Sequence, residues 1–214
     1  MIQLANVTKR ADARVNGSSF LLKDASINLP VDCFVELTCP LDLRREMFFD
    51  LISGVTSPDR GFVIRRGVRF SPLLNRGGGP SLLQNNMSLR ENIRFQAAIS
   101  FIPPRLISDF VVEVCDCADN LDDPIAVLPH PKRRAAEAAM FTVIPYDCYL
   151  VDQFNSLPDI IQMQLAYAAK SRGAGVYFGA TKTGSRIDFR DANLYFKGGS
   201  LELVYAGADE DAEA

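Results

Sequence analysis

Residues 37–54, LTCPLDLRREMFFDLISG, hold the first pattern that suggests chemistry. An apolar strand enters a short loop, and an amphipathic helix follows that ends at Ser53 and Gly54. This order can bind phosphate, because backbone N–H groups of the loop and of the helix N-terminus face the anion. Such loops use glycines and a lysine followed by serine or threonine, which this loop lacks. The stretch is therefore a nucleotide site, the remains of one, or an ordinary strand–turn–helix.

Reactive side chains of other kinds are few. The chain has a single histidine, His130, and five cysteines: Cys33, Cys39, Cys115, Cys117 and Cys148. Cys115 and Cys117 are the only close pair, and a zinc site would need further cysteines or histidines at suitable spacing. We therefore expect structural thiols, no metal site and few options for histidine-based catalysis.

Length, composition and charge narrow the class of protein. The 214 residues suit one large domain, and 48% hydrophobic residues are enough for a sizeable core. A net charge of −3 without a long basic run disfavours a nucleic-acid partner. No apolar stretch reaches the roughly 18–20 residues that cross a bilayer, and residues 1–17 lack the apolar core of a signal peptide. We therefore expect a cytoplasmic protein.

The elements that must position these residues follow from the pattern of apolar residues. Alternation predicts strands at residues 1–8, 19–29, 33–39 and 62–71, the last being a strand pair that turns near Arg66 and Gly67. Three helices are predicted next, the first opened by a capping box of Ser88 and Glu91 and the third beginning at Pro131.

The last part of the chain alternates strands with a helix. We expect strands at 148–152 and 175–180, a helix at 158–173 between them, and a hairpin at 193–203. Short apolar strands separated by helices imply a buried parallel sheet. Residues 206–214 are acidic, without apolar anchors, and are predicted to be a disordered tail.

Four motifs in this framework point to one family. They are PLDLRREMFFDLISGVTSPDRGFV, then FSPLL and SLLQNNMSLRENIRF within residues 70–95, then YDCYLVDQ at 146–153, and finally the hairpin LYFKGGSL. In this order and at this spacing, the chain up to about residue 204 resembles an ATP-binding-cassette (ABC) ATPase, most of all the subunits that power export of capsular and related polysaccharides. The resemblance implies an α/β, P-loop NTPase-like cassette with a mixed sheet and an N-terminal antiparallel β lobe. It further implies a single domain at 1–205 with a small helical subdomain at about 88–145.

The resemblance places the phosphate-binding loop at residues 39–47. Cys39 and Arg44 stand where the family has glycines, and Arg45 replaces the lysine, for which a planar guanidinium is a poor substitute. Glu46 replaces the hydroxyl that binds Mg²⁺ and would repel the phosphates. An Arg44–Glu46 or Arg45–Glu46 pair could instead fill the space of the phosphates.

Other positions implied by the resemblance have changed as well. Gln153 stands where the family has a catalytic glutamate, and a neutral amide cannot act as a general base. Gln84 and Asp152 are retained, and each is interpreted equally well as a relic of a site or as an ordinary polar residue. The vestigial nucleotide-binding set is Cys39, Asp42, Arg44, Arg45, Glu46, Met47, Gln84, Asp152, Gln153 and Thr181, the last in place of a switch histidine. The degenerate signature loop is Pro129, His130, Pro131, Lys132 and Arg133, in which two prolines remove N–H donors.

These substitutions predict a protein with no catalytic residues and a nucleotide site that has lost its chemistry. The resemblance then implies a pseudo-ATPase, a regulatory or scaffold partner in a polysaccharide export system. Its partner would be the transporter's membrane subunit or an intact ABC ATPase relative, and a homodimer is a further option. The expected location is the cytoplasm, with a peripheral position on the inner face of the cell membrane as an option. No cofactor is expected. The one exception would be ATP with Mg²⁺, if the degenerate site has kept its ability to bind them. Two alternatives stay open: a divergent subunit that hydrolyses ATP to drive export, and a small-ligand sensor that reuses the emptied site.

Overall fold

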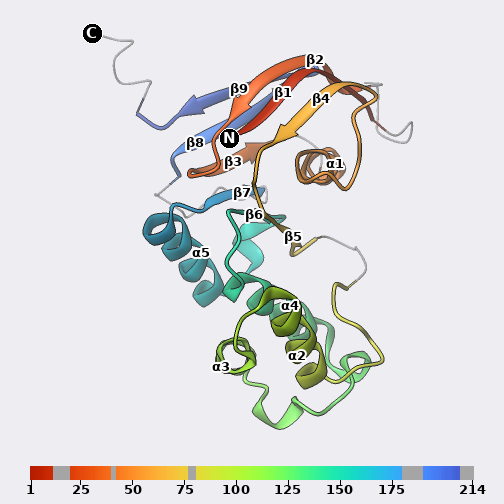
Figure 1. Ribbon diagram of the computed structural model, residues 1–214, viewed down its shortest axis with the longest axis vertical. Helices are drawn as coiled ribbons and strands as arrows, with labels where there is room; N and C mark the ends of the chain where they lie inside the picture. The colour runs from red at the N-terminus through yellow and green to blue at the C-terminus, as the bar shows by residue number, and fades with distance from the viewer. Residues whose placement is uncertain (12–19, 40–41, 77–80, 180–189, 208–214) are drawn as a thin grey trace.

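The N-terminal antiparallel sheet lies at one end of the molecule (Figure 1). The computed structural model describes residues 1–11, 20–39, 42–76, 81–179 and 190–207. Within these residues, a three-stranded antiparallel sheet has the order β2-β1-β4, formed by β1 (Ile2–Arg10), β2 (Phe20–Leu29) and β4 (Arg60–Arg65). Its central strand alternates buried and less buried side chains because one face packs on the core. This is the predicted N-terminal antiparallel lobe.

A second sheet has six strands among the described residues, in the order β5-β6-β7-β3-β8-β9. Its strands are β3 (Phe34–Thr38), β5 (Phe70–Leu74), β6 (Cys148–Val151), β7 (Gly175–Gly179), β8 (Ala192–Lys197) and β9 (Ser200–Tyr205). All neighbouring pairs are parallel except the hairpin of β8 and β9. Every residue of β6 and β7 is buried, as expected of central parallel strands covered on both faces. The predicted mixed sheet is therefore confirmed.

The strand pair predicted at 62–71 is wrong in one respect. The chain does turn at Arg66 and Gly67, but β4 pairs with β1 whereas β5 pairs with β6 in the other sheet. The turn thus carries the chain from one sheet to the other. Local alternation predicts a strand but not its partner, because pairing depends on residues far away in sequence.

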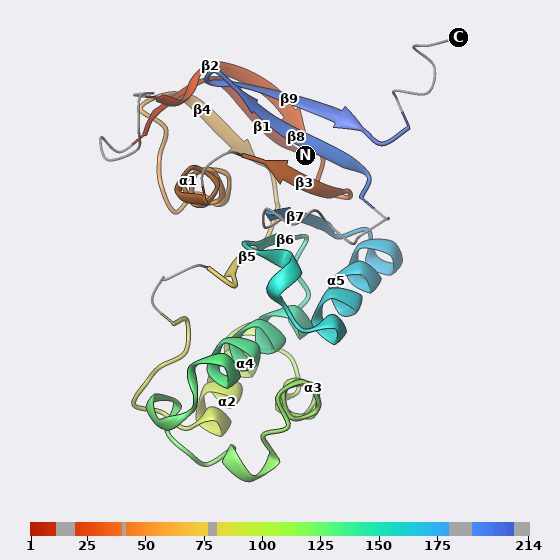
Figure 2. The same cartoon turned by 180° about the vertical axis from the view of Figure 1, so that it is seen from behind.

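Helices surround the second sheet and build a separate lobe below it (Figures 1 and 2). They are α1 (Asp42–Ser53), α2 (Leu89–Ser100), α3 (Pro104–Cys115), α4 (His130–Val143) and α5 (Asp159–Arg172). The predicted capping box is present, since the Ser88 side chain accepts the Glu91 N–H and the Glu91 side chain accepts the Ser88 N–H. Helices α2, α3 and α4 pack together as the helical lobe, while its extent as a subdomain, 88–145, stays a prediction.

The core divides along the two faces of the six-stranded sheet. Phe34, Phe154 and Phe178 pack ring against ring on the face toward the helical lobe, with ring centroids 4.9–5.5 Å apart. Val35 and Tyr177, one residue along β3 and β7, belong to the other cluster, which includes α1 and the antiparallel sheet. Because side chains alternate between the two faces along each strand, the same strands contribute to both clusters. Helix α1 lies between the two sheets, in contact with β2, β4 and β5.

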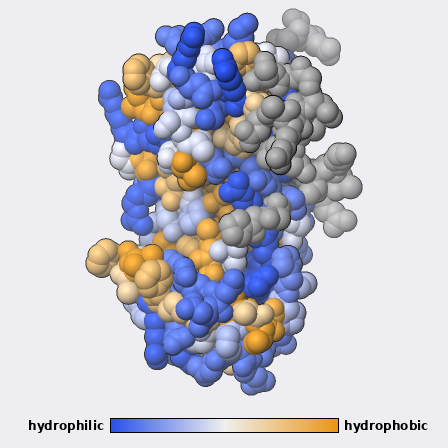
Figure 3. Space-filling view, turned by 90° about the vertical axis from the view of Figure 1, so that its right-hand side faces the viewer, coloured by the Kyte–Doolittle hydropathy of each residue, from blue (hydrophilic) through white to orange (hydrophobic). Residues whose placement is uncertain are grey.

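The surface carries exposed apolar side chains at several places. Orange atoms gather at the edges of the lower half of the molecule in Figure 3, which is the end formed by the helical lobe. The large exposed apolar residues of that lobe are Phe95, Ile99, Phe101, Leu106 and Val127. None of the helices in the described ranges has both the length and the apolar character needed to cross a bilayer.

Candidate functional site

A buried ion pair lies where the first helix meets the carboxyl ends of the parallel strands. Arg45 is in the first turn of α1, and Asp152 directly follows β6. Arg45 Nε donates to Asp152 Oδ1 at 2.6 Å, and Arg45 Nη2 lies 2.5 Å from the same oxygen. The two side chains are 2% and 0% exposed. The structure thus brings together two predicted site residues that are 107 positions apart.

Gly179, at the end of β7, makes room for this pair. A Cβ placed at Gly179 would lie 2.0 Å from Arg45 Nε and 2.2 Å from Cδ, far closer than side chains approach. The guanidinium therefore lies directly against the backbone of β7. It occupies the space above the carboxyl ends of β6 and β7, where ligands of open α/β sheets usually bind.

Two acidic side chains of α1 pair with a different cation, Arg76. Arg76 Nε donates to Glu46 Oε2 at 2.9 Å, and Arg76 Nη2 donates to Asp50 Oδ2 at 3.4 Å. The Arg44–Glu46 and Arg45–Glu46 pairs suggested by the sequence are therefore wrong. The reason is tertiary: Arg76 comes from the segment after β5, which no local pattern places beside α1. Burial by itself lowers the pKa of the Arg76 guanidinium, but the hydrogen bonds and charges of Glu46 and Asp50 outweigh it, so the pKa is raised.

The other residues of the expected loop are less informative. Cys39 is half-buried between β3 and α1, and Met47 packs against the cluster that includes α1. Arg44 is half-buried, and its Nε has no hydrogen-bond partner in the described part of the chain. Asp42 begins α1, but its side chain lies outside the described residues, as does all of Thr181.

Gln84 does not join the ion pair. Its backbone is held by Asn92, whose Oδ1 accepts the Gln84 N–H at 2.7 Å and whose Nδ2 donates to the Gln84 carbonyl at 3.1 Å. The Gln84 side chain is exposed. Its role as a relic of the site therefore stays a prediction, while Asn92, a fully buried amide, explains why this loop has a fixed shape.

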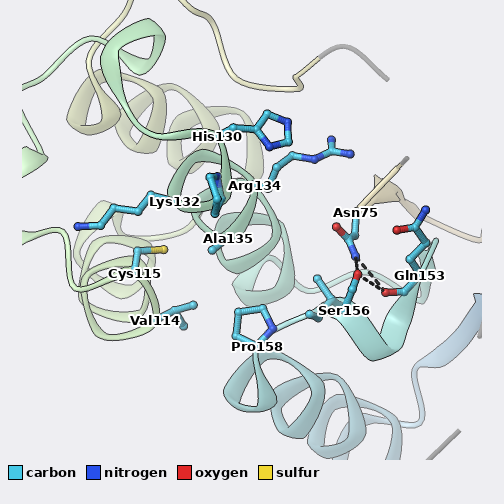
Figure 4. Close-up of a pocket in the computed structure, with 12 residues that line it drawn as sticks. Asn75, Val114, Cys115, His130, Lys132, Arg134, Ala135, Gln153, Ser156 and Pro158 are labelled. Carbon is cyan, nitrogen blue, oxygen red and sulfur yellow. Dashed lines mark hydrogen bonds between the residues drawn. The ribbon is translucent and has the colours of Figure 1, made fainter. Parts of the chain in front are cut away.

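Gln153 lines a cavity. It follows Asp152 with φ of 51°, and its carbonyl accepts Asn75 Nδ2 at 3.0 Å and Ser156 Oγ at 2.8 Å. The cavity has a volume of about 730 Å³ and is shown in Figure 4. Asn75, Gln153 and Ser156, on one wall, come from the segments that follow β5 and β6.

The opposite wall of this cavity is the start of α4 (Figure 4). His130, Pro131, Lys132 and Arg134 line it, so three of the five predicted signature-loop residues face Gln153 across the same space. Lys132 Nζ donates to the Asp116 carbonyl at 3.2 Å, and no side chain caps the helix.

The other two predicted signature-loop residues do not line the cavity. Pro129 precedes α4 and does not line the cavity, and the Nε of half-buried Arg133 has no partner among the described residues. Asn75, Ser156 and Arg134 were missed by the sequence analysis. The only local signal for them was the Asn75-Arg76 pair before a glycine-rich stretch, which marks a turn but not a cavity.

The cysteines do not contribute reactive groups to this site. Burial raises the pKa of the Cys115 thiol to about 12, and burial with nearby Asp32 raises that of Cys33 to about 11. Cys115, Cys117 and Cys148 are buried, whereas Cys33 and Cys39 are half-buried. Thiols with such pKa values stay protonated near neutral pH and are weak nucleophiles.

The arrangement offers little that could activate water. The one carboxylate at the end of β6 is neutralised by Arg45, and the next residue is an amide. Nowhere in the described ranges do three or more His, Cys, Asp or Glu side chains come together as a metal site would require. The geometry can hold polar ligands in the cavity, but none of the described lining residues is a carboxylate that could act as a general base.

Comparison with known proteins identifies relatives. The chain is 25% identical to the polysialic acid transport ATP-binding protein KpsT of Escherichia coli over 98% of this chain and 96% of that protein. It is 24% identical to the ATP-binding protein BexA of Haemophilus influenzae, over 74% of this chain and 71% of that protein. No model of a protein family matches the chain.

Solved structures show the same fold. An ATP-binding subunit of an ABC transporter superposes with a TM-score of 0.75, covering 96% of this chain and 90% of that one at 13% identity. The dimeric bacterial ABC transporter cassette MJ0796 superposes with a TM-score of 0.68, covering 94% and 97% at 15% identity. The chain therefore has the fold of an ABC cassette and is a distant relative of the ATP-binding proteins KpsT and BexA.

Proposed function

We propose that this chain is a catalytically inactive ABC cassette that acts as a regulatory or scaffold partner in a polysaccharide export system. The Arg45–Asp152 ion pair carries the proposal. It joins Asp152, which matches the aspartate that holds Mg²⁺ in P-loop ATPases, to Arg45 at the position of the phosphate-binding lysine. One contact within the chain thus replaces two contacts to a nucleotide.

The energetics of the pair support this interpretation. A buried carboxylate that loses its partner is left charged in a medium of low dielectric, which costs about 3–5 kcal/mol. Nucleotide would have to repay that cost to separate Arg45 from Asp152. The nucleotide would also approach Glu46 on α1, a carboxylate paired with Arg76 that repels phosphates.

The export system is inferred from the relatives. KpsT is a polysialic acid transport protein by name, and the match covers nearly the whole of both chains. A regulatory or scaffold role follows because a cassette without nucleotide chemistry can still present the surfaces of its fold to a membrane subunit, to an intact relative or to a second copy. The cavity between α4 and the ends of β5 and β6 favours a second candidate, a small-ligand sensor.

Calorimetry with Mg-ATP tests the inactive cassette directly. We expect no binding heat at 1 mM nucleotide and no phosphate release above the rate of a protein-free blank. The variant Gln153→Glu restores a carboxylate at the position of the catalytic base, and we expect it to be equally inactive because Asp152 stays occupied by Arg45. Micromolar binding together with turnover that disappears in Asp152→Asn would show a divergent ATPase instead.

The resemblance assigns the contact with the membrane subunit to the Gln84–Phe95 segment and nearby helices, and substitutions within Met87–Arg94 test this docking role. Arg94 is exposed on α2 and makes no ion pair within the described residues, so Arg94→Glu changes the surface without breaking the fold. We expect it to weaken co-purification with a polysaccharide-export membrane subunit at least about fivefold. Arg105→Glu on α3 is the matched control, and equal recovery of both variants would argue against docking at this surface.

A further inference from the structure

A second cavity lies at the opposite edge of the six-stranded sheet. It has a volume of about 460 Å³ and is lined by residues that directly precede the parallel strands: Arg69 before β5, Asp147 before β6 and Ala174 before β7. Figure 1 shows α5 and the start of β7 on this side of the molecule and α1 on the other. The cavity is therefore separated from the Arg45–Asp152 pair by the length of the strands.

Three arginines line this cavity. Arg66 comes from the turn after β4, Arg69 precedes β5, and Arg172 ends α5. None of the three makes an ion pair with a described carboxylate. Elsewhere in the described chain, six arginines pair with acids: Arg45, Arg76, Arg90, Arg105, Arg134 and Arg190.

The single carboxylate among the described lining residues makes no ion pair with these three cations. Asp147 Oδ2 accepts the backbone N–H of Arg69 at 2.7 Å, and the Asp147 carbonyl accepts the Gly175 N–H at 2.9 Å. The carboxylate is thus used to join the entries of β5 and β6. The cavity keeps an excess of positive charge in a chain whose net charge is −3.

Two tyrosines hold two of the guanidinium groups in place. The Arg69 guanidinium lies over the Tyr146 ring at 5.9 Å from its centroid, and that of Arg172 lies 6.0 Å from the centroid of Tyr149. Arg172 Nη2 also donates to Tyr149 Oη at 2.7 Å, and Tyr149 Oη donates to the Ile144 carbonyl at 2.7 Å. The Tyr146 and Tyr149 rings meet edge to face at 5.6 Å. Groups held in this way lose less entropy when they bind a ligand.

We propose that this cavity binds a small phosphorylated molecule, such as a sugar phosphate, through Arg66, Arg69 and Arg172. Guanidinium groups offer paired N–H donors that match the oxygens of a phosphate monoester. A dianion fits three unpaired cations better than a single carboxylate does. The volume is within the range of about 300–1,000 Å³ that small-molecule sites occupy. Tyr146, whose hydroxyl is a further donor, also lines the cavity.

This site does not depend on whether the cassette binds nucleotide, so its test is separate. Glucose 1-phosphate is titrated into the full chain by calorimetry, with glucose and glucuronate as neutral and carboxylate controls. We expect binding of glucose 1-phosphate alone. No binding at 10 mM, or equal binding of glucuronate or glucose, would overturn the proposal.

Matched variants locate the site. Arg69→Gln and Arg172→Gln should each weaken binding about tenfold or more, because each removes a charge-assisted phosphate contact. Arg69→Lys keeps the charge but loses the paired donors, and it should weaken binding by a smaller factor. Arg105→Gln removes the same charge from the exposed face of α3 and should change the affinity less than twofold. If Arg105→Gln weakens binding as much as Arg69→Gln does, the effect is one of general charge and the assigned site is wrong.

Discussion

The two edges of the six-stranded sheet use arginine in opposite ways. At the carboxyl edge, Arg45 is 2% exposed and bound to a buried carboxylate, so its charge is neutralised inside the protein. At the amino edge, Arg66 and Arg69 are exposed, and no described carboxylate pairs with their side chains. Burial and partners, rather than residue type, decide whether an arginine stabilises the fold or remains available to a ligand.

The largest expected effect is at the carboxyl edge. Arg45→Ala leaves Asp152 charged and unpaired in the core, and we expect the free energy of unfolding to fall by about 3–5 kcal/mol. Chemical denaturation followed by circular dichroism measures it. Arg44→Ala, on the preceding residue of the same helix, should cost much less, and equal losses would show that the ion pair has no special weight.

Gly179→Ala probes the same pair from the neighbouring strand. The new methyl group would meet Arg45 Nε at 2.0 Å, and we expect a loss of about 1–3 kcal/mol because the guanidinium is held in place by Asp152. A double-mutant cycle sharpens the point: with Arg45→Ala present, Gly179→Ala should cost markedly less. Strict additivity would contradict the described contact.

A half-exposed pair at this edge should have an intermediate effect. The Arg76 side chain is 35% exposed where it meets Glu46 and Asp50. Arg76→Gln should therefore lower the unfolding free energy by about 0.2–1 kcal/mol, and 1 M salt should remove most of the difference. A loss of stability as large as that expected for Arg45→Ala would mean that burial does not decide how much each ion pair stabilises the fold.

The smallest effect is expected at the amino edge. Arg66 is exposed and makes no ion pair within the described residues, so Arg66→Gln should change the unfolding free energy by less than about 0.5 kcal/mol. It should still weaken glucose 1-phosphate binding in calorimetry. A clear loss of stability without any change in binding would break the comparison between the edges.

Much of the fold could be predicted from the sequence because its signals are local. The capping box at Ser88, the buried run CYLV of β6 and the amphipathic helix α5 are each encoded within a few residues. The strand at 62–71 shows the limit, since its two halves joined different sheets. Family motifs supplied the order of the elements, and comparison with ABC structures confirmed the fold.

The candidate site was only partly foreseeable. The altered loop, Asp152 and Gln153 were found because motifs flag positions along the chain. The partners of those residues were not: Glu46 was expected to pair within its own helix and instead binds Arg76. Likewise, Asn75 and Ser156 lie beside Gln153 in the cavity only because the strands that precede them, β5 and β6, are adjacent in space.

By itself, the sequence determined which chemical groups this protein has: no glycines or lysine in the loop, an amide in place of a base, and an ABC-like succession of strands and helices. Only the tertiary structure decided which charges meet. It buried Arg45 against Asp152 and left Arg66, Arg69 and Arg172 around an open cavity. The physical reason is that propensity and periodicity act within a few residues, whereas charge pairing requires segments tens of positions apart to pack together.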